Sequence, residues 1–238
     1  MKQFAIIGLG SFGLWVLEEL LAVNVEVLIV DKDEQVVTQY RNQVAAAYVA
    51  DAIKEETIKK IVPADIDVAI IDLGDRTEVS ILVANYLKKM GVKRIVAKAE
   101  TDEHGEILRL VGVTDVVFPN REAAKRIMPP LLSESMFSYM PISEHLVMAE
   151  VNFPAEYVGK TVVDADIRSE LGLNVIAVKP GGLGDFVFIN PEHRFEEKDR
   201  FLVVGSNERV GMVSEEAERP GRAGRLFRQF FRRGEDRT

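Results

Sequence analysis

Cysteine is absent from this chain of 238 residues, and its absence excludes several kinds of chemistry at once. A protein without thiols forms no disulfides, has no thiolate nucleophile and holds no metal through cysteine. Such a composition is consistent with a cytoplasmic protein. Histidine is scarce as well, and His104, His145 and His193 stand outside any recognisable catalytic motif. We therefore expect each of the three to lie at the surface or to be satisfied by hydrogen bonds.

Long hydrophobic runs and an excess of positive charge are also lacking. The only long uncharged stretch near the N-terminus contains three closely spaced glycines, so we expect neither a secretory signal nor a transmembrane segment. Lysine and arginine number 30 against 38 acidic residues, and the net charge of −8 argues against a general nucleic-acid binder. With 47% hydrophobic residues, a chain of this length can bury the cores of two modest domains.

Three glycines near the N-terminus, Gly8, Gly10 and Gly13, form a G-x-G-x-x-G motif between a predicted strand and a predicted helix. Residues 4–7 are an apolar run typical of a buried strand, and residues 14–21 have helical periodicity. Gly8 would permit the tight turn, Gly10 would let the backbone approach a pyrophosphate at the helix N-terminus, and Gly13 would let the helix pack on the strand. The pattern predicts a nucleotide site in preference to a purely structural turn.

An acid, Asp31, ends the second predicted strand, residues 26–31. Its distance from the glycines is typical of the carboxylate that accepts hydrogen bonds from a ribose diol, and an acid there argues against the 2′-phosphate of NADP. We predict that the neighbouring Ser11, Phe12 and Lys32 also contact the nucleotide.

Strand and helix patterns continue to alternate up to about residue 118. The further predicted strands are residues 44–49, 68–71, 94–97 and 115–118, and the predicted helices between them are residues 55–61, 78–90 and 103–111. Strands separated by helices of about 10–15 residues predict an α/β fold with a Rossmann-like, doubly wound parallel sheet, here over residues 1–119. The ligand of such a sheet lies outside the carboxyl ends of its strands.

Polar residues follow the predicted strands at that edge. Lys98 would place an ammonium near phosphate, and Asp51 would read an adenine amino group or a ribose; Ala52 and Gly74 complete the predicted contacts. The alternatives are that Asp51 and Asp75 cap the helices that follow, and that Lys98 is a solvated lysine.

The region after the sheet changes character. A helix over residues 120–132 should be interrupted by Pro129 and Pro130, and it leads into an apolar stretch over residues 135–142. We predict a crossover helix and linker over residues 120–143, whose apolar side chains are covered by a second subunit or by the same chain.

A smaller α+β domain is predicted over residues 144–216. Its predicted strands are residues 146–151, 174–179, 185–189 and 200–205, with a short helix over residues 162–171. The glycine-rich turn of residues 179–185 fits a hairpin better than a phosphate loop, because no GK[ST] signature accompanies it.

The order of these features resembles the cytoplasmic regulatory subunits of Trk/Ktr potassium-uptake systems, which consist of an RCK N-terminal domain and an RCK C-terminal domain. The resemblance covers nearly the whole chain except its last residues. It is carried by the succession of segments 4–13, 27–34, 51–52, 68–82, 95–100, 112–127 and 159–179.

The resemblance implies a regulatory protein that binds an adenine nucleotide, ATP, ADP, NAD or NADH. The positions that match the family's nucleotide site are Gly8, Gly10, Gly13, Asp31, Asp51 and Lys98. Ser11 stands where the Ktr branch usually has an arginine that reads terminal phosphates. Asn120, with Glu122 two residues on, stands where that branch often has a glutamate of an intersubunit cation site. Both departures weaken the case for ATP/ADP discrimination of the Ktr kind, and we predict no metal site.

The resemblance also implies a second ligand and several partners. Relatives bind cyclic di-AMP between two C-terminal domains, at positions that correspond to Ile167, Arg168, Asn174, Val175 and Pro191. Ordinary core packing is the alternative explanation of these residues. Such subunits form homodimers that assemble into a ring of eight beneath a potassium-translocating membrane subunit, and ligands change the conformation of that ring.

Two other functions remain open. An NAD-dependent dehydrogenase would carry the same glycine motif and ribose acid, but it needs a positioned acid–base group and a substrate pocket. Because no such group is recognisable, we predict that the protein is not an enzyme. The sequence does not separate regulation of potassium uptake from nucleotide sensing for another cation transporter.

The C-terminal residues 217–238 are rich in arginine and carry phenylalanines at helical spacing. They predict a basic amphipathic helix that contacts an anionic membrane surface or the membrane subunit. The alternatives are a solvated tail or one that folds onto the acidic body of the protein.

Overall fold

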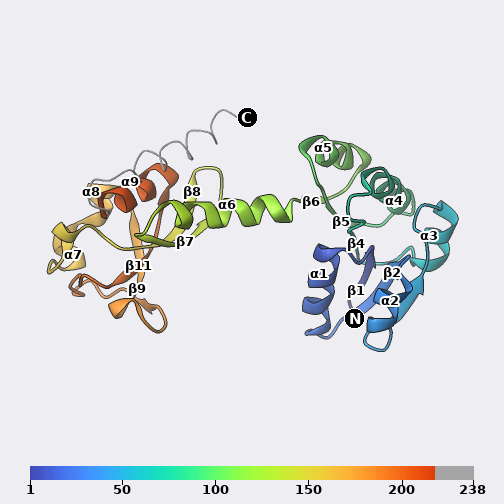
Figure 1. Cartoon of the computed structure of the whole chain (residues 1–238), viewed down its shortest axis with the longest axis horizontal. Coiled ribbons are helices and arrows are strands. Elements are labelled where there is room, and N and C mark those ends of the chain that lie inside the picture. Colours follow the sequence, from blue (N-terminus) through green and yellow to red (C-terminus); the bar gives the residue numbers. More distant parts are fainter. Residues whose placement is uncertain (218–238) are drawn as a thin grey trace. The chain divides into compact units, whose positions relative to one another are not determined.

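The structure, a computed structural model, describes residues 1–217 (Figure 1). The chain forms two compact units, of which the first spans Met1–Pro119 and the second begins at Asn120. The tail predicted over residues 217–238 lies, beyond Ala217, outside the described residues.

The N-terminal unit is a parallel sheet of six strands in the order β3-β2-β1-β4-β5-β6. Strands and helices alternate along the chain, as follows: β1 (Gln3–Ile7), α1 (Ser11–Leu21), β2 (Glu26–Asp31), α2 (Glu34–Tyr40), β3 (Ala46–Val49), α3 (Glu55–Ile61), β4 (Val68–Ile71), α4 (Thr77–Lys89), β5 (Arg94–Lys98), α5 (Asp102–Val111) and β6 (Asp115–Val117). The prediction of a doubly wound, Rossmann-like sheet is confirmed.

Alternate residues of the strands bury opposite faces of this sheet. Ile6 and Ile29 pack with Leu17 of α1 on one face, whereas Ile7 packs with Leu87 of α4 on the other. Figure 1 shows α1 and α4 on these two sides. The strand order reverses between β1 and β4, and that reversal opens the crevice in which such sheets bind ligands.

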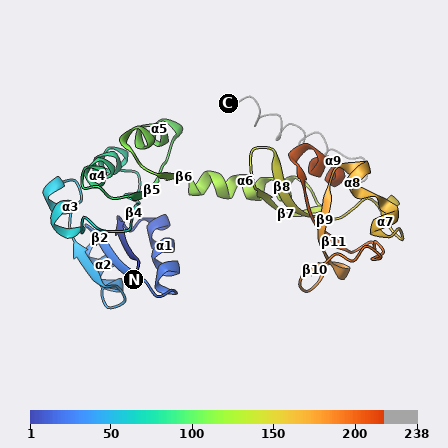
Figure 2. The ribbon, with the colours of Figure 1, turned by 180° about the vertical axis from the view of Figure 1, so that it is seen from behind.

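The C-terminal unit is an antiparallel sheet of five strands in the order β10-β9-β11-β8-β7 (Figure 2). Its elements, in chain order, are α6 (Pro119–Leu132), β7 (Met136–Pro141), β8 (Leu146–Val151), the 3₁₀ turn η1 (Ala155–Tyr157), α7 (Val162–Ala165), α8 (Ile167–Leu171), β9 (Asn174–Lys179), the 3₁₀ turn η2 (Pro180–Gly182), β10 (Val187–Phe188), β11 (Arg200–Ser206) and α9 (Asn207–Ala217). Val147 and Val203 of the sheet share one core with Val210 of α9 and Ile167 of α8. The predicted hairpin between β9 and β10 is confirmed.

The helix α6 differs from its prediction, because Pro129 and Pro130 do not interrupt it. Both prolines lie in the final turn, so only the carbonyls of Lys125 and Arg126 lose an N–H donor. Those two residues are exposed, and water can hydrogen-bond to their carbonyls.

Three other predictions for the C-terminal unit need correction. The stretch predicted as part of a linker contains strand β7, in which Met136 and Tyr139 are buried. The predicted helix of residues 162–171 is two short helices, because Asp166 between them has a left-handed backbone with φ of 39°. Strand β10 is shorter than the predicted residues 185–189.

Candidate nucleotide-binding site

The glycine loop between β1 and α1 fits so closely against β4 that side chains are excluded from it. A Cβ on Gly8, which has φ of 89°, would collide with the carbonyl of Asp72, and a Cβ on Gly10 would collide with the Asp72 carboxylate. A Cβ on Gly13 would lie 2.6 Å from the Gly8 carbonyl oxygen. The structure therefore supports a packing requirement at each glycine, and their contact with a nucleotide stays a prediction.

Asp31, at the end of β2, holds the loop from one side. Its Oδ2 accepts the N–H of Leu9 at 2.6 Å, and its Oδ1 accepts the N–H of Asp33 at 2.8 Å. Each carboxylate oxygen has a second lone pair, so the partly buried Asp31 keeps acceptor capacity for a ribose diol.

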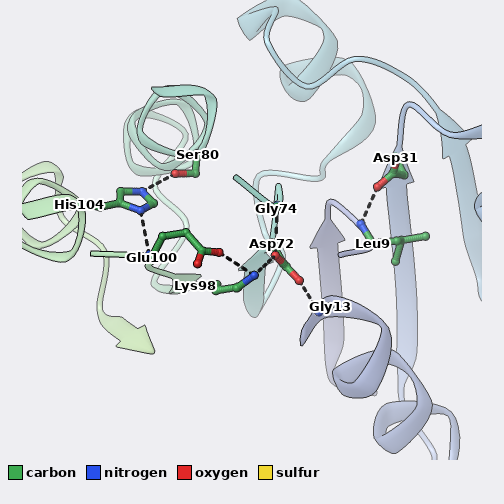
Figure 3. Close-up of polar contacts among 9 residues, drawn as sticks. All are labelled: Leu9, Gly13, Asp31, Asp72, Gly74, Ser80, Lys98, Glu100 and His104. Carbon is green, nitrogen blue, oxygen red and sulfur yellow. Dashed lines mark hydrogen bonds and ion pairs between the residues drawn. The ribbon is translucent and has the colours of Figure 1, made fainter. Parts of the chain in front are cut away.

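Asp72, directly after β4, holds the loop from the other side, and it is not among the residues predicted from the sequence. Its carboxylate is almost fully buried, at 1% exposure. Oδ2 accepts the N–H of Gly13 at 2.9 Å, and Oδ1 accepts the N–H of Gly74 at 3.3 Å (Figure 3). The sequence feature that could have identified Asp72 is an acid at the end of the strand that pairs with β1, where the strand order reverses.

Lys98, at the end of β5, lies between two carboxylates. Its Nζ is 2.7 Å from Oε1 of Glu100 and 3.5 Å from Oδ1 of Asp72, and its side chain is only 10% exposed. The alternative of a solvated lysine is therefore wrong. Burial acts to lower the pKa of Lys98, but the hydrogen bond to Glu100 and the charges of Asp72 and Glu100 raise it overall. The ammonium is charged at neutral pH.

The remaining predicted residues follow strands at the same edge of the sheet, and most of them are exposed. Asp51 is exposed; its Oδ1 accepts the N–H of Ile53 at 3.2 Å and lies 3.7 Å from a guanidinium nitrogen of Arg76. Lys32 is exposed and Ala52 is buried. Gly74 is exposed, with φ of 65°.

The helix-capping alternative is wrong for both acids. Lys54 occupies the N-cap position of α3 and Arg76 that of α4. Asp51 and Asp75 lie too early in the chain to cap these helices.

The three histidines confirm the expectation that each is exposed or hydrogen-bonded. His145 is exposed, and Nε2 of His193 is 2.7 Å from Oδ2 of Asp199. His104 is buried, with Nε2 2.7 Å from Oγ of Ser80.

The hydrogen bonds of His104 define its protonation state. Ser80 donates its hydroxyl proton to the carbonyl of Thr77, so Nε2 of His104 is the donor to Ser80. The N–H of Glu100 donates to Nδ1 at 3.3 Å. Burial lowers the pKa of His104, with a smaller opposing effect of Glu100, and the ring is neutral.

A pocket of about 350 Å³ lies in the C-terminal unit, beside α7, α8 and β9. It is lined by Val162, Val163, Asp166, Ile167, Arg168, Leu173, Asn174 and Val175. Four of the five predicted second-ligand residues are in this lining. The fifth, Pro191, adjoins it, because its carbonyl accepts the N–H of Val163 at 3.3 Å.

Neither a membrane-spanning helix nor a metal-binding cluster occurs in residues 1–217. In this part of the chain no helix combines the length and apolar character needed to cross a membrane. The same residues contain no cluster of three or more histidine or acidic side chains that could hold a metal ion.

Comparison with known proteins matches both units to described domains. Residues 4–119 match the TrkA-N domain and residues 146–217 match the TrkA-C domain. The chain is 33% identical over 207 residues to the Ktr system potassium uptake protein C of Bacillus subtilis (strain 168), covering 86% of this chain and 92% of that protein. It is 32% identical over 180 residues to the Ktr system potassium uptake protein A of Vibrio alginolyticus, covering 76% and 82% respectively.

Solved structures show the same fold. The RCK domain of GsuK matches with a TM-score of 0.63 at 19% identity, covering 98% of this chain and 53% of that chain. The GsuK channel bound to NAD matches with a TM-score of 0.61 at 18% identity, covering 98% and 44%. The chain thus spans about half the length of these structures or less, and at such identities the likeness concerns the fold alone.

Proposed function

Because this chain belongs to the family of Ktr potassium uptake proteins, with a TrkA-N and a TrkA-C domain, we propose that it is the cytoplasmic regulatory subunit of a potassium-uptake system. Nucleotide binding at the N-terminal unit would control the conformation of this subunit. The observation that carries this proposal is the glycine loop at the reversal of strand order. Asp31 and Asp72 hold this loop in place, and the N-terminus of the following helix α1 would face the ligand.

The ligand we propose is an adenine nucleotide, with NAD or NADH ahead of ATP or ADP. Asp31 suits a free ribose diol, and Ser11 provides no cation for a terminal phosphate. Gly8, Gly10, Ser11, Phe12 and Gly13 would surround the phosphates, while Asp51, Ala52 and Lys32 would lie toward the adenosine. Lys98 would act on phosphate through Asp72, because its ammonium is already held between two carboxylates.

A second ligand, cyclic di-AMP, is proposed for the C-terminal pocket. The pocket combines the apolar Ile167 and Val175 with the cationic Arg168 and the amide of Asn174. Apolar walls with a few polar groups suit a base and a phosphate. Pro191 would border the ligand from the neighbouring loop.

The mechanism would be allosteric and not catalytic. A nucleotide shifts a protein between two conformations only by the difference in its affinity for them, and about 1–3 kcal/mol corresponds to a five- to 150-fold effect. We propose that homodimers assemble into a ring of eight subunits, and that the ring transmits this difference in conformation to a potassium-translocating membrane subunit.

Calorimetric titration of the full chain with NAD, NADH, AMP, ADP, ATP and cyclic di-AMP tests this function. We expect micromolar binding of an adenine nucleotide that Asp31→Ala weakens at least tenfold. Asp65→Ala is the matched control, because it removes an exposed carboxylate before β4, at the opposite edge of the sheet.

Failure of all six ligands to bind would overturn the nucleotide-regulated function. Reduction of a substrate with NADH would instead support the dehydrogenase alternative.

A further inference from the structure

The carboxylate of Asp72 lies at the N-terminus of α1, where a nucleotide site usually has only the negative charge of the bound phosphate. The first N–H groups of a helix have no acceptor within the helix, and such groups bind phosphate. In α1 one of them, the N–H of Gly13, donates to Oδ2 of Asp72 at 2.9 Å. The N–H groups of Ser11 and Phe12 make no hydrogen bond to any residue of the described range 1–217. A phosphate bound by these two groups would therefore face the Asp72 carboxylate.

The charge of Asp72 is only partly balanced. Among residues 1–217 it pairs with Lys98, whose Nζ lies 3.5 Å from Asp72 but 2.7 Å from Glu100. Two carboxylates thus share one ammonium. Asp31, on the other side of the loop, adds a third carboxylate, with Leu9 N–H as one of its partners (Figure 3).

Burial makes this charge effective. Asp72 is 1% exposed, so little water screens it from a ligand at the loop. Charge repulsion at such a site grows with every additional phosphate charge. The pyrophosphate diester of NAD carries one negative charge per phosphorus, whereas ADP and ATP end in a phosphate with a further charge.

We propose that Asp72 is the specificity-determining residue of the nucleotide site. Its negative charge repels the additional phosphate charge of ADP and ATP, so the site selects a dinucleotide over them. This inference rests on the proposed nucleotide-binding function. Lys98 moderates the repulsion, and its position depends on Glu100, whose N–H is anchored on His104 of α5.

A structural role for Asp72 and a charge role make different predictions for Asp72→Asn. The amide oxygen of asparagine can still accept the N–H of Gly13, so the loop keeps its anchor. The negative charge is lost. A purely structural residue would leave the preference between nucleotides unchanged.

The test is the ratio of the dissociation constants for ATP and NAD, measured by calorimetry on the full chain. For Asp72→Asn we expect this ratio to move about tenfold toward ATP, which equals about 1.4 kcal/mol. Lys98→Gln should move the ratio in the opposite direction, because it leaves Asp72 without its ammonium. Glu106→Gln removes one negative charge, as Asp72→Asn does, but at an exposed position of α5. It should leave the ratio unaltered.

An unchanged ratio in a folded Asp72→Asn variant that still binds NAD would overturn the inference and leave the proposed function intact. If Asp72→Asn does not fold, Lys98→Gln decides, and a shift toward ATP there would contradict the inference. Absence of binding of either nucleotide to the unmodified chain would overturn the proposed function and this inference together.

Discussion

The carboxylates of Asp31 and Asp72 hold the glycine loop from its two sides, and each accepts one backbone N–H from it. The bonds join Asp31 to Leu9 at 2.6 Å and Asp72 to Gly13 at 2.9 Å. Hydrogen bonds to ionised acceptors are among the stronger ones in proteins. The loop is therefore organised before a ligand arrives, and binding does not have to order it.

Gly10→Ala tests this close packing. The added Cβ would collide with the Asp72 carboxylate, so the loop must move away from β4. We expect nucleotide affinity to fall at least tenfold and the thermal midpoint of the protein to drop, as measured by calorimetry and circular dichroism. Glu19→Ala, at an exposed position of the same helix α1, serves as control and should bind normally. Wild-type affinity in Gly10→Ala would show that the loop has more room than the structure allows.

His104 makes stability depend on pH. Its pKa in the folded protein lies below the ordinary 6.5, chiefly because it is buried. The unfolded chain therefore binds the proton more readily, and stability is lost as the pH falls from 6.5 through the folded-state pKa. Urea unfolding at several pH values should show this loss, and His104→Gln should reduce it. The exposed His145→Gln is the control, and an equal effect of both variants would contradict the assignment.

Which site residues were predictable follows from how local their signals are. Gly8, Gly10, Gly13 and Asp31 form a motif along the chain, and both the sequence and the structure place all four at the carboxyl edge of the sheet, beside β1 and β2. Asp72 was missed because its importance comes from β4 lying beside β1, a contact between residues 59 positions apart.

At the scale of elements, the helices and strands that follow a short-range hydrophobic pattern were predicted correctly. Those that depend on tertiary contacts or on a single backbone angle were not. The strands of the parallel sheet are continuous apolar runs such as β4, which is buried along its whole length, so they were predictable. Strand β7 was not, because its burial is irregular. The break between α7 and α8 depends on the backbone of Asp166, and hydrophobic periodicity carries no information about it.

A group of buried serines connects α9 to the segment before β7. Oγ of Ser135 donates to the carbonyl of Ser214 at 2.7 Å, and the Ser133 and Ser214 hydroxyls are also hydrogen-bonded to each other. Ser214 is fully buried. We expect Ser214→Val to lower the free energy of unfolding by about 1–3 kcal/mol, because it removes a buried hydroxyl and adds bulk.

Urea denaturation of the full chain measures this effect. Ser138→Val, at an exposed position of β7, is the matched control and should change stability little. An equal effect of the two substitutions would show that the serine group contributes nothing special.

At the scale of the whole molecule, the chain has two units with separate cores. Such units unfold as distinct cooperative transitions when their cores are independent. Ligand binding stabilises only the unit to which it binds. We therefore expect differential scanning calorimetry to show two transitions, with NAD raising one of them and cyclic di-AMP raising the other. A single ligand that raised both equally would contradict this assignment of one site to each unit.

The most direct test of the account is potassium uptake, followed with a rubidium tracer, in cells that lack this chain. We predict that its loss lowers uptake, that the wild-type chain restores it, and that Asp31→Ala does not although it reaches the same cellular level. Uptake that is unaffected by loss of the chain would contradict a role in potassium transport. Full restoration by Asp31→Ala would contradict control by a nucleotide at the glycine loop.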